Sequence, residues 1–209
     1  MSAAEGTIRF AYALEPPDGP PVGEETFAEL AGWRTILRRL GLLGQEPDRY
    51  QGLGFGNLSS RATDRPTEFV ITASQTSGID RLSDEHLVRI TYSNPERFWV
   101  DAVGRQPPSS ETLTHAMVYR ADPSVGWVFH VHCPELWERH EALALPAAAE
   151  DVEYGSPAMA AAVTELLVRH PARPIVFVTL GHRDGVFACG ASAAATGGAL
   201  LGLLARVLG

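Results

Sequence analysis

The sequence predicts an α/β fold in which a largely antiparallel sheet is flanked by helices. Short extended segments, bounded by turn residues, outnumber the segments with helical periodicity. Several of them follow one another with only short turns between, which favours antiparallel pairing because parallel strands need a long crossover. The length of 209 residues suits one globular domain, so we expect a single sheet with its helices packed against it.

The first half of the chain supplies one helix and several of the expected strands. A cluster of prolines and glycines at 15–23 ends what we treat as a lead-in segment, residues 1–23, before the domain at residues 24–209. Glu24–Leu43 has apolar residues at helical spacing and ends among glycines, which predicts a helix. The strands expected after it lie at residues 57–62, 68–73, 86–91 and 98–103.

The second half alternates helices and strands. Ser109 or Ser110 can cap a helix that runs to about Arg120. The closing stretch, Ala191–Leu208, is apolar, but its many alanines and glycines and its Thr196 indicate a packed helix and not a membrane span. Between these two helices we expect a strand at 125–133, a helix at 157–169 and paired strands at 175–180 and 185–189.

The composition excludes several classes of function. All 17 basic residues are arginines, so neither a lysine Schiff base nor a P-loop lysine is available. The net charge of −8, without a dense basic run, argues against a nucleic-acid partner, whereas a small anionic substrate stays open. Cys133 and Cys189 are too few for a disulfide framework, although one disulfide is formally open. Residues 1–12 lack the pattern of a signal peptide, so we expect a cytoplasmic protein.

The segment WVFHVHCP, residues 127–134, is the most informative about chemistry. His130 and His132 are two apart on a predicted strand and project from the same face, while Cys133 projects from the other. Two imidazoles at this spacing can share a metal ion such as Zn²⁺, which needs at least one more protein ligand and an open position for catalysis. The alternative is a pair of half-buried histidines satisfied by hydrogen bonds.

Two other segments carry residues that could meet this pair. Glu111 lies in the first turn of a predicted helix, directly after two serines, and His182 lies at the end of an apolar strand with glycines on both sides. His115, four residues after Glu111, lies on the same helix face, where it either supports a site or belongs to the core. Sequence spacing alone leaves open whether these residues converge.

Five segments resemble the class II aldolase/adducin head fold, of the fuculose-phosphate aldolase type, in their order and spacing. They are GFGNLSSR (54–61), FVITAS (69–74), PSSE (108–111), HAMVYRADPSVGWVFHVHCP (115–134) and GHRDGVFACG (181–190). The resemblance covers roughly residues 27–206, and the combination is much more specific than any one motif. It implies a three-layer α/β/α architecture with a central, largely antiparallel sheet.

The resemblance also implies a metal site. His130, His132 and His182 would bind a divalent metal, usually Zn²⁺, with Mn²⁺, Co²⁺ or Fe²⁺ as alternatives. Glu111 would be the acid/base catalyst and would also ligate the metal in the resting state. This suits retro-aldol chemistry without a lysine, because a Lewis-acid metal stabilises the enediolate and a carboxylate displaced by the substrate can move a proton.

A substrate pocket follows from the same resemblance. The family's phosphate or carboxylate site maps onto Asn57, onto Ser77 and Gly78 in the loop after FVITAS, and onto Ser109 and Ser110. Amide groups, hydroxyls and the N–H groups at a helix start suit an oxyanion. The two serines would also be compatible with helix capping.

Three features depart from the family's pattern. Residues 75–78 (QTSG) change the loop after FVITAS, which favours a carboxylate or a neutral polyol over a phosphate. His182 is followed by Arg183 and Asp184, either of which is placed to face the pocket. The family often supplies a tyrosine from a C-terminal tail, but the sequence ends at Gly209 without one, so no proton donor to the aldehyde fragment is evident.

From these observations we expect a metal-dependent lyase that acts on a small hydroxylated carbonyl compound, a sugar phosphate or a sugar acid, by aldol cleavage through an enediolate. An epimerase, a dehydratase or a decarboxylase on the same metal is the nearest alternative, because reactions diverge within one fold. A non-catalytic, adducin-like interaction module is a further alternative, which the complete set of Glu111 and three histidines disfavours. The resemblance also implies a homotetramer, and from the charge and composition we expect no nucleic-acid or membrane partner.

Overall fold

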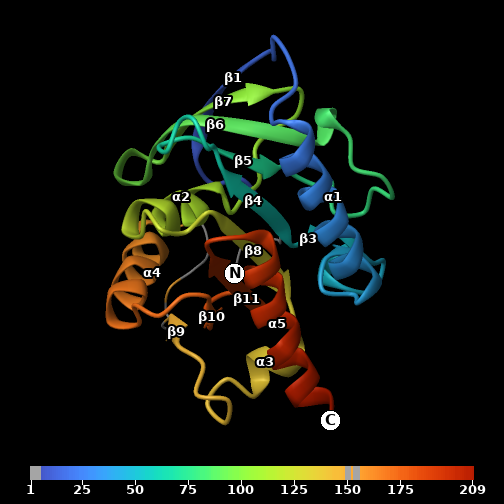
Figure 1. The fold of residues 1–209 in the computed structure, drawn as a ribbon, viewed down its shortest axis with the longest axis vertical. Coiled ribbons are helices and arrows are strands. Elements are labelled where there is room, and N and C mark those ends of the chain that lie inside the picture. Colours follow the sequence, from blue (N-terminus) through green and yellow to red (C-terminus); the bar gives the residue numbers. More distant parts are fainter. Residues whose placement is uncertain (1–5, 149–151, 153–155) are drawn as a thin grey trace.

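The computed structural model describes residues 6–148, 152 and 156–209 of the chain. Within this part, nine strands form one sheet (Figure 1). Their order across the sheet is β1 (Ala11–Glu15), β7 (Trp99–Gly104), β6 (Leu87–Asn94), β5 (Phe69–Thr72), β4 (Asn57–Arg61), β8 (Trp127–His132), β11 (Gly185–Gly190), β10 (Ile175–Thr179) and β9 (Ala147–Ala148). Two short strands, β2 (Gly44–Gln45) and β3 (Gly54–Phe55), pair separately.

The strand pairing is antiparallel except at the two edges of the sheet. β1 runs parallel to β7 at one edge, and β9 runs parallel to β10 at the other. The six pairs between these edges are antiparallel. The prediction of a largely antiparallel sheet is confirmed.

Helices cover both faces of the sheet (Figure 1). One face carries α2 (Thr112–Ala121) and α4 (Pro157–Arg169), and the other carries α1 (Glu24–Arg39), α3 (Pro134–Glu138) and α5 (Ala193–Leu208). Side chains alternate between these two faces, so Val128 of β8 joins the core beneath α2 and α4, whereas Phe129 joins the core beneath α1 and α5. The predicted three-layer α/β/α fold is confirmed. Among the described helices, none is both long enough and apolar enough to cross a membrane.

Some local expectations differ from the structure. The lead-in segment contributes β1, where the sequence predicted no strand, because the partner that makes Ala11–Glu15 a strand is β7, far away along the chain. The first helix ends at Arg39 and not at Leu43, and Gly41 follows with φ +68°.

The start of α2 also differs, because neither Ser109 nor Ser110 is its N-cap. The helix begins at Thr112, and Glu111 holds the N-cap position without a side-chain cap. The cause is a turn ahead of the helix, in which the Ser109 carbonyl accepts hydrogen bonds from the Thr112 N–H and the Thr112 hydroxyl. Ser109 instead contacts the start of β4, where Asn57 Nδ2 donates a hydrogen bond to Ser109 Oγ.

Candidate functional site

The two histidines of the HVH sequence lie in the middle of the sheet. They end β8, where His130 is opposite Asn57 of β4 on one side and Phe187 of β11 on the other. All six residues of β8 are buried, because both faces of this strand are covered. The ring centroids of His130 and His132 lie 5.1 Å apart, so both side chains project from the same face of β8, as predicted.

The third histidine reaches the same point from a turn. His182 lies between β10 and β11, in a turn closed by hydrogen bonds from the His182 N–H to the Thr179 carbonyl and from the Gly185 N–H to the His182 carbonyl. A side chain at Gly185 would collide with Thr179 and with His182 itself, so this turn needs a glycine. One ligating atom from each of His130, His132 and His182 lies within 4.8 Å of the other two.

The environment keeps two of these imidazoles neutral. Burial lowers the pKa of His130 and of His132 well below the usual value, and the neighbouring His182 lowers both further. His130 Nδ1 lies 3.3 Å from the Val186 carbonyl oxygen, which can only accept, so Nδ1 donates and Nε2 keeps its lone pair. This Nε2 is buried and has no hydrogen-bond partner among the described residues.

Glu111 completes the group. It is 2% exposed, and its Oε1 lies 3.4 Å from Nδ1 of His182. Its Oε2 accepts a hydrogen bond of 2.9 Å from the Thr114 hydroxyl, one turn along α2, which fixes the direction of the carboxylate. The structure therefore brings together the four residues that were predicted as the metal site.

This set of side chains fits a divalent metal ion. Three imidazoles converge at ligand spacing, and one of them carries a buried lone pair that the protein leaves unused. Imidazole nitrogens with one carboxylate oxygen are ligands that Zn²⁺ and other first-row divalent metals accept. The site can therefore hold a divalent metal between the sheet and the start of α2.

The predicted anion-binding residues gather next to this group, with one exception. Asn57, Ser77, Ser109 and Ser110 line a small cavity of about 20 Å³. Asn57 Nδ2 donates a hydrogen bond of 3.0 Å to Ser109 Oγ. Gly78 is not among the residues that line this cavity: its Cα side faces Gln45, and its carbonyl accepts a hydrogen bond from Arg38. A role for Gly78 in anion binding stays a prediction.

Sequence analysis missed the residue that holds the loop of this cavity. Arg34 of α1 is 2% exposed, and its Nη2 donates to the carbonyl oxygens of Thr76, Ser77 and Ile79 at 2.6, 3.1 and 2.5 Å. Burial lowers the pKa of this guanidinium to about 10. A signal was present, because Arg34 occupies the apolar stripe of α1 between Leu30 and Leu37.

Sequence analysis also missed the tyrosine beside His132. The ring of Tyr50 meets the His132 ring edge-on, with 4.5 Å between ring centroids. Its hydroxyl donates a hydrogen bond of 2.7 Å to Asp184 Oδ2. Of the two residues expected to face the pocket, Asp184 is thus buried against Tyr50, while the Arg183 side chain is 86% exposed. No sequence pattern links Tyr50 to a segment 134 residues away.

Behind the metal-site residues lies a buried hydrogen-bonded group. Ser59 Oγ lies 2.7 Å from His115 Nδ1 and 2.7 Å from the Tyr119 hydroxyl. Burial lowers the pKa of His115 to about 3, so this imidazole is neutral. Phe187 separates it from the metal-site histidines, because this ring contacts both His115 and His130. His115 therefore packs behind Phe187, outside the group of three converging histidines.

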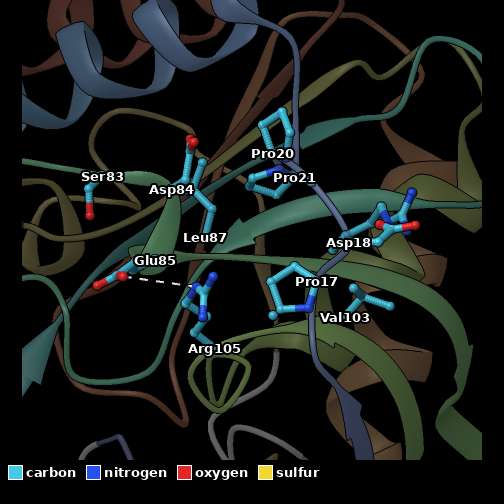
Figure 2. A pocket seen from close by; sticks show the side chains of 13 residues that line it. Pro17, Asp18, Pro20, Pro21, Ser83, Asp84, Glu85, Leu87, Val103 and Arg105 are labelled. Atoms are coloured by element: carbon cyan, nitrogen blue, oxygen red, sulfur yellow. Dashed lines mark ion pairs between the residues drawn. The ribbon is translucent and has the colours of Figure 1, made fainter.

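A larger hollow of about 590 Å³ lies elsewhere on the molecule (Figure 2). The segment Pro17–Pro21 forms one side of it, and the other side carries the Glu85–Arg105 ion pair, whose Oε1 and Nε lie 3.9 Å apart. None of the predicted site residues lines it. This hollow and another of about 710 Å³ are both larger than the cavity beside the histidines, so volume alone does not indicate the converging residues.

The fold and the convergence of three histidines with a glutamate agree with a comparison to known families. The sequence profile of the class II aldolase and adducin N-terminal domain matches residues 48–201. The chain belongs to this family. The recognition made from the motifs is confirmed.

The proteins similar to this chain are named for different reactions. A methylthioribulose-1-phosphate dehydratase of Geobacillus thermodenitrificans is 36% identical over 83 residues, a match that spans 37% of this chain and only 34% of that protein. The fold is similar to the crystal structure of L-fuculose-1-phosphate aldolase from Thermus thermophilus, with a TM-score of 0.60, 21% identity and coverage of 87% and 94% of the two chains. It is also similar to YgbL from Escherichia coli, a putative aldolase/epimerase/decarboxylase, with a TM-score of 0.63, 17% identity and coverage of 88% and 86%.

Proposed function

We propose that this chain is a divalent-metal-dependent lyase that cleaves a carbon–carbon bond in a small hydroxylated carbonyl compound. The observation that carries the proposal is the convergence of three buried histidines, with ligating atoms within 4.8 Å of one another, beside the buried carboxylate of Glu111. A non-catalytic interaction module would have no reason to bury such a group, because buried polar side chains cost free energy unless they are used or satisfied.

The roles of the individual residues follow from their positions. His130, His132 and His182 would hold the metal, and Glu111 would contribute its carboxylate in the resting state. A bound divalent metal would act as a Lewis acid towards the carbonyl and hydroxyl oxygens of the substrate and stabilise an enediolate. Asn57, Ser77, Ser109 and Ser110 would bind the end of the substrate away from the reacting carbon atoms, in the neighbouring cavity.

Glu111 would carry the proton. In a retro-aldol cleavage the substrate hydroxyl loses its proton as the carbon–carbon bond breaks, and the enediolate carbon then takes up a proton. Oε2 of Glu111 is held by the Thr114 hydroxyl, so Oε1, on the histidine side, is the oxygen placed to accept a proton and to return it. Burial around this group excludes water, which strengthens its electrostatic interactions with the substrate.

A second candidate is a dehydratase that uses the same residues. It is favoured by the 36% identity over 83 residues to a methylthioribulose-1-phosphate dehydratase. In a dehydration Glu111 would take a proton from the carbon next to the carbonyl and return it to the hydroxyl on the following carbon, which leaves as water. In the aldol cleavage it would instead take a proton from a hydroxyl and return it to a carbon.

The metal and the assembly belong to the same proposal. We propose Zn²⁺ as the metal, because three imidazoles and an exchangeable carboxylate suit a catalytic zinc site, with Mn²⁺, Co²⁺ and Fe²⁺ as alternatives. We also propose a homotetramer. Light scattering of the purified protein tests the assembly, and a monomer would contradict it.

The first experiment measures metal content. Elemental analysis of the purified protein should find about one divalent metal per chain, and His130→Ala should lose it. His170→Ala is the matched control, because His170 is exposed at the end of α4 and is not one of the three converging histidines. A wild-type protein without metal, or a His130→Ala variant that keeps it, would show the metal site to be wrong.

The second experiment identifies the reaction. The metal-loaded protein is incubated with sugar phosphates, aldonates and keto acids, and the products are followed by NMR. Two carbonyl fragments indicate aldol cleavage, and a product lighter by one water indicates dehydration. Glu111→Gln should lower kcat by a factor on the order of 10² or more while the metal stays bound. No turnover of any compound would count against the enzyme and in favour of a binding module.

A further inference from the structure

Two aromatic rings contact the side chain of His132, the last residue of β8. The Tyr50 ring meets the imidazole edge-on, with 4.5 Å between the ring centroids and an angle of 75° between the ring planes. The centroid of the Phe55 ring lies 5.5 Å from that of the imidazole and 4.9 Å from that of Tyr50. The direction of the His132 ring therefore depends on where the short segment before β4 places these two rings.

The backbone of Tyr50 has a conformation that a tyrosine rarely adopts. Its φ is +47°, and that of the next residue, Gln51, is +61°, both in the left-handed region. A conformation of this kind persists only where the surrounding contacts hold it. The Tyr50 side chain therefore needs contacts that outweigh the cost of its backbone.

The Tyr50 hydroxyl makes such contacts. It donates a hydrogen bond of 2.7 Å to Asp184 Oδ2 and accepts one of 3.3 Å from Arg49 Nη2. Asp184 is 7% exposed, so its carboxylate needs a hydrogen-bond donor close by. Nε of Arg183 lies 3.8 Å from the same carboxylate oxygen, farther away than the hydroxyl, and its side chain is largely exposed. Tyr50 and Asp184 therefore satisfy each other across two segments that are far apart in the chain.

Asp184 is a firm anchor, because the backbone around it is hydrogen-bonded. The Cys133 N–H donates to the Asp184 carbonyl at 2.8 Å, and the Gly185 N–H donates to the His182 carbonyl at 2.9 Å. Gly185 also lies opposite His132 in the pairing of β11 with β8. The main chain thus fixes the turn that carries His182 to the end of β8. It does not fix the direction of the His132 ring, which is set by rotation about side-chain bonds.

We propose that the hydrogen bond between Tyr50 and Asp184 anchors the Tyr50 ring against His132, and so directs this imidazole to bind a metal together with His182. The centroids of the two imidazole rings lie 4.7 Å apart. Tyr50 is then a positioning residue that acts on the metal through His132. Partners of this kind raise metal affinity, because they hold a ligand in the direction that the metal requires. This inference rests on the proposed function for the metal, whereas the contacts of Tyr50 are properties of the chain itself.

The first test measures the affinity for Zn²⁺ by competition with a chromophoric chelator. Tyr50→Phe removes only the hydroxyl and Asp184→Ala removes its acceptor, so each variant should bind Zn²⁺ about 10–100-fold more weakly than the wild type. The double variant should lose no more affinity than the weaker of the two single variants, because both changes break the same bond. Asp184→Asn keeps an oxygen that accepts a hydrogen bond and should bind Zn²⁺ more tightly than Asp184→Ala.

Tyr92→Phe is the matched control. The Tyr92 hydroxyl is also hydrogen-bonded, to Asn94 Nδ2 at 3.1 Å, but this tyrosine is exposed on β6. Its loss should leave the Zn²⁺ affinity unchanged. Thermal melts of the chelated proteins verify that every variant is folded.

Co²⁺ reports ligand geometry, which a general loss of stability would not change. The visible absorption bands of Co²⁺ bound to Tyr50→Phe should differ in position or intensity from those of the wild type, and those of Tyr92→Phe should not. Wild-type Zn²⁺ affinity in Tyr50→Phe would overturn the inference. So would losses that multiply in the double variant, or an Asp184→Asn variant that binds Zn²⁺ as weakly as Asp184→Ala.

Crystal structures of the chelated proteins separate this inference from the proposed metal site. A wild type that binds no metal would refute the proposed function, but these structures would still decide the role of Tyr50. In the wild type the rings of Tyr50 and His132 should keep their edge-on contact. In Tyr50→Phe the ring of residue 50 should move and the His132 ring should rotate, and two unmoved rings would overturn the inference.

Discussion

Replacing Arg34 should destabilise the protein more than any replacement of an exposed arginine. In Arg34→Leu the carbonyls of residues 76, 77 and 79 lose a donor at 2.5–3.1 Å in a buried position. A hydrogen bond from a charged group contributes about 1.5 kcal/mol or more to the free energy of unfolding. The two N–H groups of Nη2 together therefore contribute roughly 3 kcal/mol. For a chain of 209 residues this corresponds to a fall in Tm of roughly 6–12 °C.

Thermal unfolding followed by circular dichroism, with urea unfolding as a second measure, tests this prediction. Arg39→Leu is the control, because Arg39 is an exposed arginine at the end of the same helix. Replacing an exposed side chain of this kind changes the free energy of unfolding by at most about 0.5 kcal/mol. If Arg34→Leu loses no more stability than Arg39→Leu, then the buried guanidinium does not hold the cavity loop and the reasoning fails.

Three further predictions follow from single features of the structure. Gly197 of α5 faces the Trp33 ring, so Gly197→Ala should lower the free energy of unfolding by about 1–3 kcal/mol in thermal melts. Gly198 has open space around it, so Gly198→Ala should raise the same free energy by up to about 1 kcal/mol. His115 has a pKa near 3 when folded and near 6.5 when unfolded, so the unfolded state binds more protons between these values and stability falls as pH falls through this window. Urea titrations at several pH values give the change in the free energy of unfolding per pH unit. This change should be smaller in His115→Gln than in the wild type by up to about 1.4 kcal/mol per pH unit, and equal values would contradict the assigned protonation. A metal present at about 100 times its Kd adds about 2.7 kcal/mol to the free energy of unfolding. A chelator should therefore lower the wild-type Tm by roughly 5–11 °C and leave the Tm of His130→Ala unchanged.

The sequence by itself determined the class of fold and singled out three histidines and a glutamate that lie together in the folded chain. Alternation on a strand placed His130 and His132 on one face, because the period of a strand is a local property. The order of the five motifs then indicated which glutamate and which third histidine belong with them. Local turn and period signals also located the four strands between residues 57 and 103 to within a few residues.

Only the tertiary structure decided the contacts between segments far apart in the chain. Ala11–Glu15 is a strand because β7 is beside it, and Arg34 is a structural residue because the loop at 76–79 folds back over α1. Tyr50 reaches Asp184 across 134 residues, which no local pattern encodes. Gln75 was visible in the sequence as a departure in the loop, but its left-handed backbone and its hydrogen bond with Gly54 come from the folded chain. Periodicity reports which face a side chain takes, whereas the size and polarity of a cavity depend on neighbours that only the folded chain brings together.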